Sequence, residues 1–270
     1  MNREDIIAFA ETFLKDAPGN YIASEAALTP DCVGLRMYDA PIFAFGSPED
    51  GVFEEFRSPS VIGSHFILPH EWLPGVKTVI AFFLPYSERI KKANALNRDW
   101  PADEWLHGRY EGQIFLQSFA LSLQKFISDA GFVSLTPAFD KRFKSGTASD
   151  GFTSNWSERH VAFACGLGTF SLSTGLITRK GVCGRFGSIL TVLDLPKDVK
   201  DYGHFLDYCI MCGACVKRCP VDAITLDGGK SHPPCKDFVE FTLTKHKPRY
   251  GCGKCQVKVP CESAIPKRKK

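Results

Sequence analysis

The chain has 270 residues, 44% of them hydrophobic, and a formal net charge of +3 at pH 7. A chain of this length and composition can bury a substantial core, as one large domain or as a core domain followed by a small module. Its mild positive charge is spread along the chain and does not require a nucleic-acid partner, and no segment approaches the roughly 18 apolar residues of a membrane span.

The first 19 residues predict an amphipathic helix and not a signal peptide. Acidic residues stand where a signal peptide would carry basic ones, and no unbroken apolar stretch follows them. The apolar residues recur at helical spacing: Ile6, Phe9, Ala10, Phe13 and Leu14. We therefore expect a cytoplasmic protein that does not associate with a membrane.

Loops, strands and a helix are expected in turn after this first helix. The segment before Thr78 is rich in Pro, Gly and Phe with little periodicity, which predicts wrapping loops and no separate domain. Apolar runs at 77–87, 133–139 and 187–196 predict strands that end at turns. Residues 110–131 predict a helix that ends at Gly131 and places five apolar side chains on one face: Phe115, Phe119, Leu123, Phe126 and Ile127.

A further helix is predicted within residues 154–168. Asn155 is the candidate N-cap, Glu158 stands three residues later as its capping-box partner, and Gly166 can end the helix. The alternative is a helix that only packs in the core. Cysteine density changes abruptly near Asp201, where we place a domain boundary.

Cysteine spacing after residue 208 predicts iron-sulfur chemistry. Eight of the eleven cysteines lie there, and a reducing compartment favours metal binding over disulfides. The run from Cys209 to Pro220 has the spacing C-x2-C-x2-C-x3-C-P, in which three thiolates surround one 4Fe-4S cluster and the fourth, Cys219, serves a second cluster. Gly213 permits the tight loop. The alternative is a structural zinc site, which uses two separated C-x2-C pairs and leaves a thiolate over.

The last cysteines decide how the two clusters are completed. A ferredoxin-type repeat would place a cysteine four residues after Cys255, but that position is Val259, and the cysteine stands two residues later as Cys261. A bulge through Val259 and Pro260 can still present this thiol, so we predict a ligand that has moved. The predicted sets are Cys209, Cys212, Cys215 and Cys261 for cluster 1, and Cys219, Cys235, Cys252 and Cys255 for cluster 2.

Other roles are open for some of these cysteines. Cys261 could bind nothing, which would leave an open iron in cluster 1, and Cys235 taken alone could be a buried thiol. Three further cysteines lie outside the spacing and are expected in or near the core: Cys32, Cys165 and Cys183.

The chain resembles the epoxyqueuosine reductase family and, more distantly, the reductive dehalogenases. The likeness covers residues 70–266 and includes the segments 73–87, 157–181 and 187–196, the cysteine order, and the pattern ER-x-x-A-x-x-x-GLG from Glu158 to Gly168. It implies an α+β architecture, with a nitroreductase-like α/β domain at 1–200 that binds cobalamin and a double-cubane, ferredoxin-like module at 201–270 that holds two 4Fe-4S clusters. The residues that match the family's cofactor-facing turns are Gly168, Thr169, Phe170, Ser171, Gly187 and Ser188; their alternative role is that of glycine-rich turns in a packed domain.

The sequence departs from the family pattern in two places. The family's presumed proton donor is an aspartate six residues before the Glu of the ER pair, and this position is Phe152 here. Asp150 is the candidate catalytic acid in its place, with an exposed loop carboxylate as the alternative, because a general acid must lie within hydrogen-bond distance of its substrate. Longer family members also carry a helical-repeat tail that helps to grip tRNA, whereas this sequence ends at PKRKK.

The resemblance therefore implies a cytoplasmic oxidoreductase. Electrons from a low-potential donor such as ferredoxin or flavodoxin would pass through the two clusters to cobalamin, which reduces an electrophilic substrate. That substrate would be epoxyqueuosine in tRNA or a small organic molecule, and the two departures make the tRNA less favoured. One alternative is a ferredoxin-like electron-transfer protein whose α/β domain binds flavin or docks a partner, and another is a zinc-stabilised nucleic-acid binder.

Overall fold

A four-stranded antiparallel sheet forms the centre of the structure, a computed structural model that describes residues 1–148 and 151–267. Its strands, in spatial order, are β1 (Ile42–Gly46), β2 (Thr78–Pro85), β8 (Gly184–Thr191) and β3 (Ser134–Leu135). The register places Ala81 of β2 between Ala44 of β1 and Ser188 of β8. The long strands β2 and β8 therefore form the middle of the sheet.

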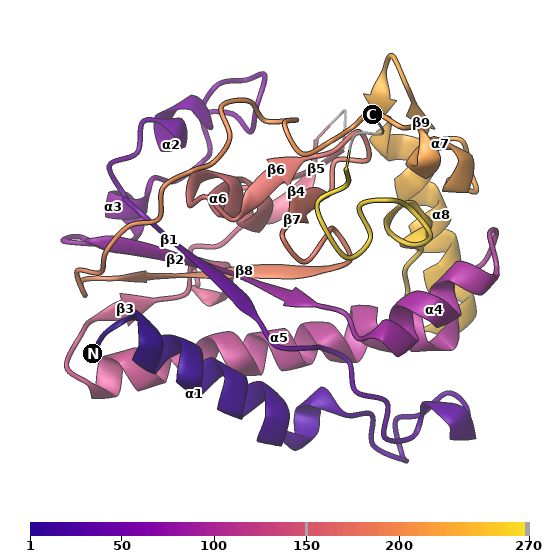
Figure 1. Ribbon diagram of the computed structural model, residues 1–270, viewed down its shortest axis with the longest axis horizontal. Helices are drawn as coiled ribbons and strands as arrows, with labels where there is room; N and C mark the ends of the chain where they lie inside the picture. The colour runs from indigo at the N-terminus through magenta and orange to yellow at the C-terminus, as the bar shows by residue number, and fades with distance from the viewer. Residues whose placement is uncertain (149–150, 268–270) are drawn as a thin grey trace.

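Helices cover both faces of this sheet, as Figure 1 shows. They are α1 (Arg3–Asp16) and α5 (Asp103–Asp129) on one face, and α2 (Val52–Glu55), α3 (Pro69–Trp72) and α6 (Glu158–Ala164) on the other. Side chains of a strand alternate between faces, so Ile80 and Phe82 pack in the first layer, whereas Val79 and Ala81 pack in the second. Burial on both faces explains why β2 is apolar without interruption.

The remaining elements connect the sheet or belong to the cysteine-rich end. The connecting elements are α4 (Glu88–Leu96), β4 (Ser145–Ala148), β5 (Gly151–Ser154), β6 (Gly168–Phe170), β7 (Leu176–Thr178), and the 3-10 turns η1 (Pro18–Asn20), η2 (Pro30–Cys32) and η3 (Pro137–Phe139). The cysteine-rich end contains α7 (Ala214–Arg218), β9 (Ile224–Thr225), β10 (Gly229–Lys230), α8 (His232–His246) and η4 (Lys254–Gln256). Figure 1 shows α7, β9 and α8 together at one end of the sheet, beside α4. Among the described residues, no helix is both long and apolar enough to cross a membrane.

Several predicted elements are confirmed. The first helix is α1, which begins with a capping box formed by Asn2 and Asp5, and the helix predicted at 110–131 is α5, which begins earlier, at Asp103. Gly131 and Gly166 follow their helices with φ of 90° and 94°, the left-handed conformation that ends many helices. The strands predicted at 77–87 and 187–196 are β2 and β8, whereas only Ser134–Leu135 of the third is a strand.

Two predictions are wrong. The segment before Thr78 is not only loops, because its short apolar run forms β1, which is buried at every position against β2. Asn155 does not cap α6: its side chain instead bonds the backbone of Arg142 and Lys144, and the N-cap residue is Ser157, without a side-chain capping bond. Glu158 therefore has no capping-box role.

Candidate iron-sulfur sites and the cavity beside them

The first three cysteines of the C-x2-C-x2-C run lie on the tight loop that leads into α7 and on the first turn of that helix, which contains Cys215. Met211 and Gly213 both have positive φ, 51° and 68°, which turns the chain between Cys209 and the start of the helix. Cys212 is exposed, and Cys209 and Cys215 are partly buried. This loop presents three thiols from seven consecutive residues, as the spacing predicts.

Cys261 lies beside this loop because its backbone is fixed to a distant turn. Its carbonyl accepts a hydrogen bond from Val182 N at 2.9 Å, and Glu262 O accepts one from Cys183 N at 3.3 Å. Gly181 makes the close approach possible, since a Cβ there would lie 2.2 Å from Glu262 O. Burial, together with the neighbouring thiols of Cys209, Cys215 and Cys212, raises the pKa of Cys261 to about 12. The structure therefore brings together the four thiols that the sequence assigns to cluster 1.

The other four cysteines gather into a second set. Burial raises the pKa of Cys255, with Cys235 and Cys219 adding to the shift, and burial together with Cys255 and Cys235 raises that of Cys252 to about 12. The turn between Cys252 and Cys255 depends on Gly253, which has a φ of 64° and lies under Trp105, where a Cβ would come within 1.7 Å of the indole ring.

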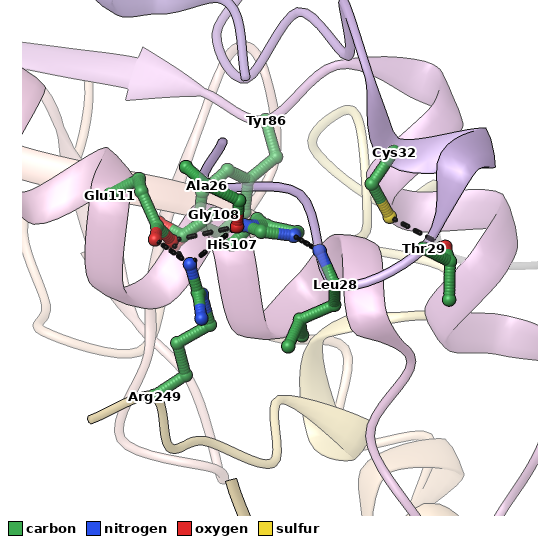
Figure 2. Close-up of polar contacts among 9 residues, drawn as sticks. All are labelled: Ala26, Leu28, Thr29, Cys32, Tyr86, His107, Gly108, Glu111 and Arg249. Carbon is green, nitrogen blue, oxygen red and sulfur yellow. Dashed lines mark hydrogen bonds and ion pairs between the residues drawn. The ribbon is translucent and has the colours of Figure 1, made fainter. Parts of the chain in front are cut away.

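Hydrogen bonds tie this second set to the core helices. Figure 2 shows Arg249 bonded to Glu111 of α5 and to Ala26 O. In the same network His107 Nε2 accepts from Leu28 N at 3.1 Å, so its Nδ1 carries the proton and donates to Glu111. Arg249 precedes Cys252 by three residues, and Cys252 O also accepts a bond from Asn94 Nδ2 of α4 at 3.0 Å. The position of Cys252 is therefore set by both α4 and α5.

A cavity of about 1810 Å³ lies between the start of β8, α5, α6 and the cysteine-rich end. Such a volume exceeds that of typical small-molecule sites, which measure ≈ 300–1,000 Å³. All four cysteines of the second set line it, and none of the first set does: Cys219, Cys235, Cys252 and Cys255. A cluster on the second set would therefore border the cavity.

The predicted cofactor residues divide into two groups. Four line the cavity: Phe170, Ser171, Gly187 and Ser188. Gly168 and Thr169 do not; Gly168 packs against Ile177 O, and Thr169 Oγ1 accepts a hydrogen bond from Tyr208 N at 2.9 Å. Gly187 also has a packing role, because a Cβ there would lie 2.3 Å from the Phe82 ring.

The two positions considered for the proton donor also differ. Asp150 lies outside the described residues. Phe152, at the family's aspartate position, lines the cavity and is 64% exposed. An aromatic ring therefore replaces the acid on this wall.

Sequence reasoning missed several polar groups around the cavity. Both carboxyl oxygens of Glu158 are buried without a hydrogen-bond partner among the described residues, and burial raises its pKa to about 8, with nearby Ser188 opposing the shift. Four other residues that line the cavity also have a buried polar atom for which residues 1–148 and 151–267 provide no partner: Thr136, Thr174, Arg185 and Gln256. Buried polar groups normally have partners, so this concentration favours a polar ligand.

The cavity also has a basic wall. Arg109 stacks over Tyr250 with 4.7 Å to the ring centre, and burial together with Arg185 lowers its pKa to about 10. Arg159 is exposed toward the cavity and donates to Thr174 O at 2.6 Å. The sequence signal for this wall is the ER pair, Glu158 and Arg159, both of which line the cavity. From the sequence, Glu158 is interpreted as a capping residue at the start of a helix, and no role in the cavity is predicted for it.

Within the described part of the chain, no group of three or more His, Cys, Asp or Glu side chains is arranged to hold a single metal ion. A cubane differs from such an ion, because each of its four cysteines binds a different iron atom. The donor chemistry of each set, four cysteine thiols, fits one 4Fe-4S cluster. Cys32, Cys165 and Cys183 are buried in the core region, as predicted.

The chain is similar to 4Fe-4S binding proteins in its cysteine-rich part and to epoxyqueuosine reductases over most of its length. Residues 204–225 match the family model described as 4Fe-4S binding domain. The chain is 27% identical over 216 residues to an epoxyqueuosine reductase of Leadbetterella byssophila, covering 72% of this chain and 62% of that protein. It is 26% identical over 222 residues to the epoxyqueuosine reductase of Francisella cf. novicida, covering 76% and 58%. The chain thus spans about three fifths of the length of the curated relatives it matches.

Solved structures show the same likeness at the level of the fold. An epoxyqueuosine reductase bound to an epoxyqueuosine-modified tRNA stem loop has a TM-score of 0.54 at 19% identity, covering 96% of this chain and 65% of that one. A catabolic reductive dehalogenase has a TM-score of 0.53 at 13% identity, covering 83% and 30%. The predicted resemblance to both groups is confirmed, as is a mixed α/β fold with a 4Fe-4S binding segment.

Proposed function

We propose that this protein is an iron-sulfur oxidoreductase of the epoxyqueuosine reductase type, with two 4Fe-4S clusters and a cobalamin. One observation carries the proposal: the second set of four cysteines lines a large cavity, and the first set, which does not line it, adjoins the second set through Cys215 and Cys255. Electrons that enter at the exposed Cys212 side would cross from one cluster to the other and reach the cavity. In this proposal residues 1–200 form a nitroreductase-like domain and residues 201–270 a double-cubane module.

The cavity suits a large cofactor that carries many polar groups. A corrin ring has amide side chains around its edge, and these can pair with the buried polar atoms of Thr136, Thr174 and Gln256. Other parts of the cavity wall are formed by Phe170, Ser171, Gly187 and Ser188. When bound, cobalamin would supply the reducing metal centre, while the protein would position it and exclude water.

The substrate is proposed to be an electrophile reduced in this cavity. The curated relatives are named for epoxyqueuosine, and one structural neighbour was solved with a tRNA stem loop. Phe152 on the cavity wall favours a small organic molecule over a polar modified base, because its exposed ring offers an apolar contact. Asp150 stays the proposed proton donor, and a low-potential ferredoxin or flavodoxin the proposed electron donor.

Anaerobic purification followed by cobalamin binding tests this function. We expect brown protein with about eight irons per chain, which retains added cobalamin through gel filtration and shifts the corrin absorption to its base-off form. A Cys235→Ser variant should lose iron from the second set, and a Cys32→Ser variant, altered in the core, should not. Colourless protein without iron would overturn the proposal, and iron-loaded protein that neither retains cobalamin nor changes its spectrum would favour an electron carrier.

A further inference from the structure

The second set of cysteines is surrounded by cationic side chains. Lys230 of β10 lies against Cys235 and Cys255, and all three line the same cavity. Lys254 stands between Cys252 and Cys255 in the chain and is completely buried. Two arginines complete the group: Arg218, which precedes Cys219 at the end of α7, and Arg159, which lies near Cys255.

These four charges are not cancelled by carboxylates. Lys254 Nζ donates to Asn94 O and Oδ1 at 2.8 and 2.7 Å, and Arg218 donates to the carbonyls of Asn94, Ala95 and Asn97. Arg159 likewise donates to a backbone carbonyl. Among residues 1–148 and 151–267, none of the four forms an ion pair with Asp or Glu. Neutral acceptors therefore hold Lys254, Arg218 and Arg159 in place, and no ion pair with a carboxylate accompanies these contacts in the described part of the chain.

The first set has different neighbours. The charged groups that act on Cys215 and Cys261 are the other cysteines of the module. Cys212 is exposed to water, and Cys261 is followed by an acidic residue, Glu262. The lysines nearest to this set in sequence, Lys217 and Lys258, are exposed to water, and neither is among the charged groups that act on Cys215 or Cys261.

The cations around the second set affect the reduction potential of a cluster bound there. A 4Fe-4S cluster with four thiolates becomes more negative when it gains an electron, so an adjacent positive charge stabilises the reduced form and raises the potential. Burial alone would act in the opposite direction, because water stabilises the more negative state. Four cations around the buried second set offset that loss.

We propose that Lys230, Lys254, Arg159 and Arg218 raise the potential of the second cluster above that of the first, so that electrons collect beside the cavity. This inference rests on the proposed function. In each step one electron leaves the first cluster, which is oxidised, and enters the second, which is reduced; a low-potential one-electron donor then reduces the first cluster again. The second cluster would be oxidised again when it passes its electron to the cofactor in the cavity, and two such cycles would supply the electrons for a two-electron substrate reduction.

The test is a redox titration of anaerobically purified full-length protein, monitored by electron paramagnetic resonance. Wild-type protein should show two midpoint potentials. In Lys230→Gln the higher midpoint potential should fall by about 59 mV, which lowers the ratio of reduced to oxidised cluster at a fixed potential about tenfold for one electron, while the lower midpoint potential stays unchanged. Lys230→Arg should restore it. Lys245→Gln, which removes the same charge from an exposed position on α8, should move neither potential.

Arg159→Gln provides a second variant, because its side chain is exposed in the cavity and its loss does not disturb the core. It should lower the same potential as Lys230→Gln. Iron content checks that each variant still holds both clusters. The proposal is wrong if these substitutions leave both potentials unchanged or lower only the more negative one. That result would leave two clusters in place, whereas wild-type protein without clusters would refute the proposed function itself.

Discussion

Replacing Glu158 by Gln should stabilise the protein relative to wild type, and this stability difference should grow as the pH rises. The carboxyl oxygens of Glu158 are buried and have no hydrogen-bond partner in the described part of the chain, and burial raises the pKa of this group from the usual 4.5 to about 8. Below pH 4.5 the group is protonated in both the folded and the unfolded chain and affects neither. Between pH 4.5 and 8 the unfolded chain releases a proton that the folded chain keeps, so stability falls as pH rises. Above pH 8 both forms are ionised and the loss is constant.

The size of this effect follows from the shift. Each pH unit corresponds to about 1.4 kcal/mol, and pH 7 lies two and a half units above the pKa of the group in the unfolded chain. Ionisation in the unfolded chain therefore lowers the stability of wild type by about 3 kcal/mol at pH 7, relative to its stability below pH 4.5. Glutamine has nearly the same shape and cannot ionise. The stability difference between Glu158→Gln and wild type should therefore be small near pH 5 and grow toward pH 8.

Urea unfolding followed by tryptophan fluorescence measures this difference at half-unit steps from pH 5 to 8.5. Comparing variant with wild type at each pH cancels the other titrating groups. Glu49→Gln, at an exposed position, is the matched control and should show no trend. A difference that does not change with pH, or that favours wild type at pH 8, would refute the reasoning about Glu158.

Two further substitutions test the cluster sites. Cys261→Ser should reduce the iron content by about half and remove the signature of one cluster, because Cys261 completes the first set; unchanged iron and unchanged spectra would show that this thiol is not a ligand. Gly253→Ala places a Cβ within 1.7 Å of the Trp105 ring at a φ of 64°, so it should destabilise the second cluster and release its iron faster, as measured by transfer to a chelator. Gly203→Ala, where a Cβ would meet nothing within 4 Å, is its control, and equal release rates in the two variants would contradict the packing argument.

Local sequence was sufficient where a feature depends on neighbouring residues. The apolar run of β2 ends at Pro85, and the three-residue cysteine steps before Pro220 define their loop without any distant contact. The number of cysteines in the module also predicts Cys261 as the fourth ligand of the first cluster. The actual position of Cys261 depends on the hydrogen bonds that Val182 N and Cys183 N donate to Cys261 O and Glu262 O across about eighty residues, which no local pattern encodes.

Features that depend on distant contacts were not predictable in the same way. Glu158 has the spacing of a capping-box residue, and only the cavity wall that it shares with Ser188 shows that its carboxyl group is buried. The five residues of β1 include two phenylalanines and a glycine, and the run is too short for its periodicity to separate strand from loop. Pairing with β2 decides its structure.

Iron anomalous scattering from crystals grown without oxygen tests the central claim most directly. The account predicts two iron peaks per chain. One should be enclosed by Cys209, Cys212, Cys215 and Cys261, and the other, at the edge of the cavity, by Cys219, Cys235, Cys252 and Cys255. A single peak, or a peak at the cavity edge bound by cysteines of the first set, would contradict it.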